Sequence, residues 1–116
     1  MATDTDFLNG VPELLVLRLL GSRPMHGYEL VQAIKLATGG VLAFGEGCVY
    51  PLLHRLEADG HVLGKREAVN GRGRVVYRLT AAGRKRQAAV AGRWELVTAA
   101  VGTVLRGESD GTPTLA

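Results

Sequence analysis

A hairpin signal in the middle of the chain is the feature that most constrains its fold. Asn70-Gly71 lies between two runs rich in strand-forming residues, "HVLGKREA" and "VVYRLT". Asn-Gly is typical of two-residue turns, because both turn positions need a positive φ that these residues tolerate. We therefore expect a two-stranded antiparallel hairpin whose tip carries Arg72 and Arg74.

Three segments with helical spacing precede this hairpin, over residues 11–20, 26–40 and 46–59. The first is a dense apolar run with Pro12 near its start, and the second ends at the pair Gly39-Gly40. Three short helices followed by a basic hairpin is the element order of a winged helix-turn-helix. The fold class that we predict is mainly α with a small β-hairpin wing (α+β).

The third segment, "GCVYPLLHRLEADG", places Pro51 inside an amphipathic helix. A proline more than one turn into a helix removes a backbone hydrogen bond, so we expect an irregular first turn. Such a start would turn Cys48, Val49 and Tyr50 outward, at a helix end that favours phosphate. We predict that this segment is the recognition helix of a DNA-binding domain.

A long helix is expected after the hairpin, over residues 81–106, with Thr80 as its N-cap. Its apolar positions are separated by steps of four, three, four and three, which is a heptad pattern suited to packing against another helix. We predict that they form a homodimer interface. They are Val90, Trp94, Val97, Val101 and Val104.

The expected organisation is a disordered N-terminus at 1–6, a DNA-binding domain at 7–79, a dimerisation helix at 80–106 and a disordered tail at 107–116. A chain of 116 residues suits one compact domain. No apolar run approaches the length of about 18 residues that a membrane span needs, and we expect no membrane partner. Cys48 is the single cysteine, which fits a reducing cytoplasm.

Positive charge is concentrated in one part of the chain. Residues 54–93 hold ten basic and three acidic side chains, whereas the whole chain has a net charge of only +3. A concentrated positive field favours a polyanionic partner such as double-stranded DNA, although a solvated basic surface would show the same pattern.

The sequence gives little support for a metal, a cofactor or catalysis. His26, His54 and His61 lack metal-ligand spacing, and no orienting acid is evident for a Cys48 nucleophile. A helix N-terminus lowers a thiol pKa, so Cys48 could be a redox switch; a small packed side chain is the alternative. We expect no enzyme activity, no metal and no cofactor.

Four motifs, "HGYEL", "GCVYPLLHRLEADG", "GRGRVVYRLTAAG" and "LNGVPELLVLRLL", together resemble the PadR family of bacterial transcriptional regulators. The resemblance covers about residues 7–106, and this chain is similar to the family's short members. It implies a winged helix-turn-helix and a homodimer that binds an inverted-repeat operator, usually as a repressor and sometimes released by small molecules. Many members have Ser and Thr where this chain has Gly45 and Cys48, which puts a contact from Cys48 in doubt.

The candidate DNA contacts come from the start of the second helix, the third helix and the hairpin. Tyr28 and Tyr50 could instead be core residues, and Arg55 could lie on a solvated face. A winged helix that binds a protein partner and touches no DNA is the alternative function. The candidates are His26, Tyr28, Gly47, Cys48, Tyr50, His54, Arg55, Lys65, Arg72 and Arg74.

Trp94, the single tryptophan, allows two interpretations. It could be packed in a dimer core, or two indole rings across a two-fold axis could hold a small aromatic or cationic effector by stacking. The resemblance to short family members implies that Leu14, Leu17, Ala91 and Thr98 line the same space.

Overall fold

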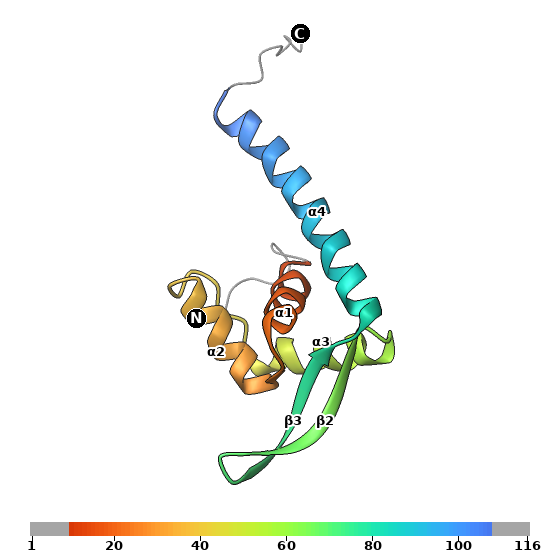
Figure 1. Cartoon of the computed structure of the whole chain (residues 1–116). Coiled ribbons are helices and arrows are strands. Elements are labelled where there is room, and N and C mark those ends of the chain that lie inside the picture. Colours follow the sequence, from red (N-terminus) through yellow and green to blue (C-terminus); the bar gives the residue numbers. More distant parts are fainter. Residues whose placement is uncertain (1–9, 108–116) are drawn as a thin grey trace.

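The computed structural model describes residues 10–107, and the predictions for the two chain ends fall outside this range, apart from Gly107. The elements follow one another in the order expected of a winged helix-turn-helix (Figure 1). They are α1 (Val11–Ser22), β1 (Met25–His26), α2 (Gly27–Ala37), α3 (Glu46–Ala58), β2 (Val62–Val69), β3 (Arg72–Leu79) and α4 (Ala81–Leu105). The predicted fold class is confirmed.

The predicted hairpin is formed by β2 and β3, with Val69 paired to Arg72 across the turn. Asn70 and Gly71 have φ values of 52° and 78°, the left-handed conformations that the turn needs. A third strand, β1, was not predicted. It pairs with β3, giving the sheet order β1-β3-β2.

One hydrophobic core joins the three helices to the base of the sheet. Phe44, between α2 and α3, is its largest fully buried side chain. The helices α1, α2 and α3 and the strands contribute residues with almost no exposed surface. These include Val16 and Leu17 from α1, Leu30 and Ile34 from α2, Val49, Leu53 and Leu56 from α3, Val62 from β2 and Tyr77 from β3.

The helix α3 runs without a break through Pro51, so the expected irregular first turn is wrong. The Gly45 carbonyl accepts hydrogen bonds from the Cys48 and Val49 N–H groups, both at 3.0 Å. Proline has no N–H, and the helix continues because Leu52, Leu53 and Leu56 are buried in the core and hold it in place.

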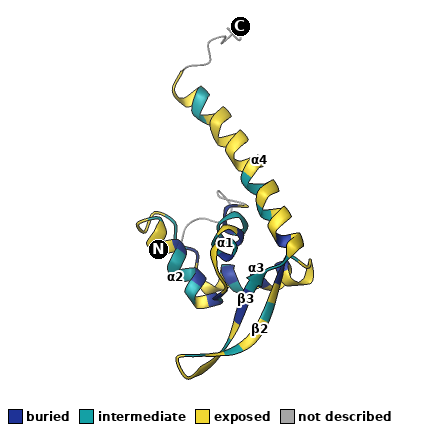
Figure 2. Cartoon of the chain, in the orientation of Figure 1, coloured by how far each residue is buried: buried dark blue, intermediate teal, exposed yellow. Residues whose placement is uncertain are grey.

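The helix α4 begins as predicted and ends at Leu105. The Thr80 side chain accepts a hydrogen bond from the Gly83 N–H at 3.0 Å and donates one to the Gly60 carbonyl at 2.6 Å. Beyond its first turns the helix leaves the body of the protein and is mostly exposed (Figure 2). The wing extends from the body in the opposite direction (Figure 1).

The expectation that no stretch could span a membrane needs correction. By length and composition α4 passes that test, since it holds an 18-residue window with a mean hydropathy of 1.2. None of that window is buried. A single such helix is weak evidence. Arg93 and Glu95 lie near the middle of α4, where a charge would cost about 2.5–3.5 kcal/mol in a bilayer.

Candidate nucleic-acid interface

One face of the wing is basic. Residues paired across an antiparallel ladder point to the same face, and alternate residues along a strand share it. The pairs Lys65–Val76, Glu67–Arg74 and Val69–Arg72 therefore place Lys65, Arg72 and Arg74 together. Glu67, the carboxylate on this face, is bound by Arg78 at 3.0 Å. Lys65 and Arg72 are exposed and Arg74 is partly exposed, so the wing offers positive charge to solvent.

A stripe along α3 also faces solvent. Gly47, Tyr50 and His54 are spaced so that they lie along one side of the helix, away from the buried leucines. Gly47 and His54 are exposed, whereas Tyr50 is partly buried. The stripe is therefore accessible to a partner, with the Tyr50 ring as its largest group.

Tyr50 is held against the start of α2. A Cβ built on Gly27 would lie 2.5 Å from Tyr50 Cε1 and 2.9 Å from its hydroxyl oxygen. The ring can occupy this position only because residue 27 has no side chain. Gly27 and Tyr28 of the "HGYEL" motif therefore have separate roles. Gly27 leaves room for the Tyr50 ring, whereas Tyr28 is 45% exposed and is not a core residue.

His26 is engaged in capping α2. Its Nδ1 accepts a hydrogen bond from the Glu29 N–H at 3.2 Å, and its Nε2 lies 4.0 Å from the Glu29 carboxylate. The carboxylate also binds Arg23. His26 therefore has a structural role as the N-cap of α2, and a DNA contact from His26 stays a prediction.

Arg55 points away from the exposed stripe of α3. Its guanidinium binds the Glu13 carboxylate of α1 at 3.2 Å, and one residue step places it about 100° around the helix from His54. Glu13 also accepts two hydrogen bonds from Arg86 of α4, at 2.8 and 3.3 Å. In this structure Arg55 belongs to an ion cluster that joins three helices, and a DNA contact from Arg55 stays a prediction.

Cys48 is partly buried against the hydrophobic core. Burial raises the pKa of its thiol, which is the opposite of the lowering expected for a redox-active residue at a helix N-terminus. The structure favours the packed alternative over the redox switch.

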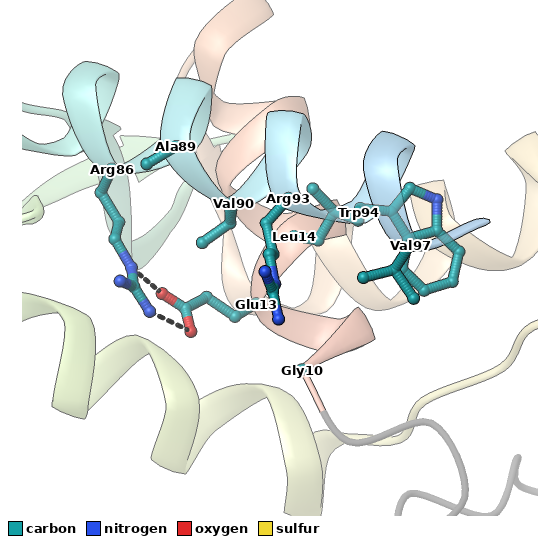
Figure 3. A pocket seen from close by; sticks show the side chains of 9 residues that line it. All are labelled: Gly10, Glu13, Leu14, Arg86, Ala89, Val90, Arg93, Trp94 and Val97. Carbon is teal, nitrogen blue, oxygen red and sulfur yellow. Dashed lines mark hydrogen bonds and ion pairs between the residues drawn. The ribbon is translucent and has the colours of Figure 1, made fainter. Parts of the chain in front are cut away.

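A groove of about 480 Å³ lies between α1 and the first half of α4 (Figure 3). This volume is within the range of about 300–1,000 Å³ that is usual for small-molecule sites. Trp94 lies at one end, and the hydrogen bonds between Glu13 and Arg86 lie at the other. The lining residues are Gly10, Glu13, Leu14, Arg86, Ala89, Val90, Arg93, Trp94 and Val97.

The groove matches the predicted ligand site only in part. Leu14 and Trp94 line it, whereas Leu17 is fully buried in the core and neither Ala91 nor Thr98 reaches it. Its charged residues Glu13, Arg86 and Arg93 were not predicted as site residues. Among the described residues, no three histidine, cysteine or acidic side chains are grouped in a way that could hold a metal ion.

Known proteins resemble this chain in sequence and in structure. Residues 16–89 match the family described as the Transcriptional regulator PadR-like family. The chain is 39% identical over 79 residues to Transcriptional regulator Rv3488 of Mycobacterium tuberculosis (strain ATCC 25618 / H37Rv). That alignment covers 68% of this chain and 71% of the relative.

Solved structures agree over most of the chain. A transcriptional regulator from Clostridium thermocellum superposes with a TM-score of 0.77 and 26% identity, covering 84% of this chain and 96% of that one. A PadR family transcriptional regulator from Eggerthella lenta superposes with a TM-score of 0.72 and 30% identity, covering 86% of each chain. With its single long C-terminal helix, the chain belongs to the PadR-like family of transcriptional regulators, as one of its short forms.

Proposed function

We propose that this protein is a cytoplasmic homodimeric repressor that binds an inverted-repeat operator in double-stranded DNA. Each protomer would insert the exposed stripe of α3 into a major groove and lay its wing along the phosphate backbone. The two half-sites would be about one helical turn, ~34 Å, apart. The alternative function is a protein-interaction module that touches no DNA.

The observation that carries DNA binding is that one chain carries both a basic wing face and an exposed stripe on α3. Lys65, Arg72 and Arg74 share one face of the hairpin, and β2 begins close after the end of α3. Phosphate contacts from such a wing would supply affinity, while Tyr50 and His54 would meet base edges or phosphates. Tyr28 and Gly47 are exposed and would lie at the border of this surface.

The observation that supports a homodimer is the apolar strip along α4. Trp94, Val97 and Val101 are 40–50% exposed and Val104 is 70% exposed, although they follow a heptad pattern. Exposed apolar residues at this spacing are typical of helix-on-helix interfaces. Val90, the first residue of the pattern, is partly buried against the core of its own protomer.

The groove beside Trp94 supports an effector site. Trp94, Leu14 and Val97 would contact a flat aromatic molecule. The groove holds two arginines, Arg86 and Arg93, against one carboxylate, Glu13. This charge balance favours an aromatic molecule without positive charge over a cationic effector.

The test is a salt-dependent binding titration with DNA from upstream of the protein's own gene, beside a scrambled duplex. Arg72→Ala/Arg74→Ala should weaken binding to both duplexes and reduce the salt slope by about 4 for a dimer, because four phosphate contacts are lost. Arg18→Ala/Lys35→Ala removes the same charge from exposed positions on α1 and α2 and is the matched control.

Unchanged binding in the wing variant would reject the proposed DNA contacts. If neither duplex binds the wild-type protein while a protein partner binds α4, the interaction module is the better account.

A further inference from the structure

Glu13 is the residue through which the groove, the recognition helix and the C-terminal helix meet. It lines the groove, it binds Arg55 of α3, and it binds Arg86 of α4. We propose that Glu13 is a positioning residue that fixes the angle between α3 and α4. This inference rests on the proposed function, because that angle would set how far apart the two reading heads of a dimer lie.

Glu13 is the carboxylate that binds both guanidinium groups of this cluster. Its side chain is only 12% exposed, and it accepts three hydrogen bonds from two guanidinium groups. Single exposed ion pairs contribute little, but this carboxylate is shielded and shared between two cations. Without its charge, Arg55 and Arg86 would face each other with no anion between them.

The attachment of α4 to the body explains why one carboxylate can control its direction. The base of the helix is fixed where Gly83 meets the His61 carbonyl, since a Cβ at residue 83 would lie 1.9 Å from that oxygen. Arg86 is the next fixed point, one turn further on, and Val90 packs against the core one turn beyond it. From Arg86 to Leu105 the helix rises about 28 Å, so a tilt of about 10° displaces its end by about 5 Å.

The groove places a ligand where it could act on this cluster. Figure 3 shows the Glu13 and Arg86 side chains joined at one end of the lining and Trp94 at the other. A molecule stacked on Trp94 that also reaches Arg86 or Arg93 would compete with Glu13 for its arginine. Loss of that ion pair would release the angle between α4 and α3.

The first experiment measures this angle directly and needs neither DNA nor an effector. Spin labels are placed on Ala58→Cys of α3 and Ala99→Cys of α4 in a Cys48→Ala background, and labelled protein is diluted with a large excess of unlabelled protein. Both labelled positions are exposed. Pulsed electron paramagnetic resonance then measures the distance between the two labels, which reports the position of α4 relative to α3 within one chain.

Glu13→Gln should broaden or shift the distance distribution by about 3 Å, the displacement of residue 99 for a tilt of about 10°. Arg86→Gln should change the distance distribution in the same way. Residue 86 is exposed, so this variant replaces Glu13→Gln in the experiment if Glu13→Gln folds poorly. Glu95→Gln removes an exposed carboxylate of α4 and is the matched charge control. Distributions identical to the wild type in both cluster variants would overturn the proposal.

A second experiment separates this inference from the proposed function. Glu13→Gln adds one positive charge, which alone would tighten binding to any duplex. We expect instead that the preference for upstream over scrambled DNA falls about tenfold, whereas Glu95→Gln keeps it. An undiminished preference would overturn the positioning role. If the wild type shows no preference, the proposed function fails, and the distance measurement alone decides the role of Glu13.

Discussion

At the scale of single residues, two glycines occupy positions where a methyl group has no room. Gly27 faces the Tyr50 ring, and Gly83 faces the His61 carbonyl oxygen. Both residues hold functional elements in place, since Tyr50 belongs to the exposed stripe of α3 and Gly83 anchors α4. A glycine is needed at each because of a contact from another part of the chain.

Gly27→Ala should therefore lower the free energy of unfolding by about 1–3 kcal/mol, the usual cost of overpacking. The cost should be smaller in a Tyr50→Ala background, because the clashing ring is gone. Urea denaturation of the wild type, the two single variants and the double variant measures the cost of Gly27→Ala in both backgrounds. Gly47→Ala is the control, since a Cβ there meets nothing within 4 Å, and it should be neutral or stabilising by up to about 1 kcal/mol. Equal costs in both backgrounds would reject the contact.

Glu13 gives the second prediction at this scale. The hydrogen bond from Arg86 lowers the pKa of Glu13, against the opposing effect of burial, and the charges of Arg86, Arg55 and His61 lower it further. A lowered pKa in the folded state adds stability above the unfolded pKa, near 4.5, and this stability is lost as the pH falls through the folded pKa.

Glu13→Gln should consequently show a shallower loss of stability on acidification than the wild type. Thermal unfolding followed from neutral pH into the acid range measures this difference, with Glu95→Gln as the control. Parallel curves for wild type and Glu13→Gln would contradict the lowered pKa.

At the scale of elements, the first turns of α4 determine where the rest of that helix points. Thr80 caps the helix, Gly83 approaches the body and Val90 packs on the core. Arg93, Trp94 and Val97 line the groove beside α1, and most residues of the remaining turns are exposed. The direction of α4 is thus set near its N-terminus.

Gly83→Ala should destabilise the protein by about 1–3 kcal/mol or more, because the new Cβ overlaps a backbone oxygen that cannot move aside easily. Gly92→Ala lies in the same helix with nothing within 4 Å of its Cβ, and it should stabilise the helix by up to about 1 kcal/mol. Thermal unfolding compares the two. If Gly83→Ala lowers the stability only slightly, the close approach of residue 83 to His61 is not needed to anchor α4.

The sequence predicted those elements whose signals are local. Asn70-Gly71 specifies its own turn, Thr80 caps its own helix, and the helix ranges follow from apolar spacing. The strand β1 was missed because two residues beside Pro24 carry no pattern, and pairing with β3 alone makes them a strand. The Glu13 cluster was missed because its arginines lie 42 and 73 residues away in sequence.

For the candidate site too, the sequence could not predict contacts between residues that are far apart in the chain. Exposure of Tyr28, Gly47, His54, Lys65 and Arg72 agrees with their predicted role without testing it. The partner of Arg55 depends on where α1 lies, which no spacing within α3 reveals. The pKa of Cys48 likewise depends on burial by other elements.

At the scale of the whole molecule, the basic wing and the apolar strip of α4 extend in opposite directions from one core (Figure 1). The prediction of a regulator that is not an enzyme is confirmed by the family. A long exposed apolar strip is unfavourable in water, so α4 needs a covering surface. A second copy of the same helix provides one, which is why we propose a homodimer.

Val101→Glu should convert this dimer to a monomer, because it places two like charges together in the middle of the strip. Ala99→Glu adds the same charge on the opposite side of α4, at an exposed position, and should leave the dimer intact. Light scattering over a range of protein concentrations measures both. A dimer that survives Val101→Glu would show that the strip is not the interface.

The most direct test of the account is the salt-dependent titration with upstream and scrambled DNA, with the oligomeric state followed by light scattering in the same samples. We predict that a dimer binds the upstream DNA more tightly than the scrambled duplex and that its affinity falls steeply with salt. Equal weak binding to both duplexes, or specific binding by a monomer, would contradict it.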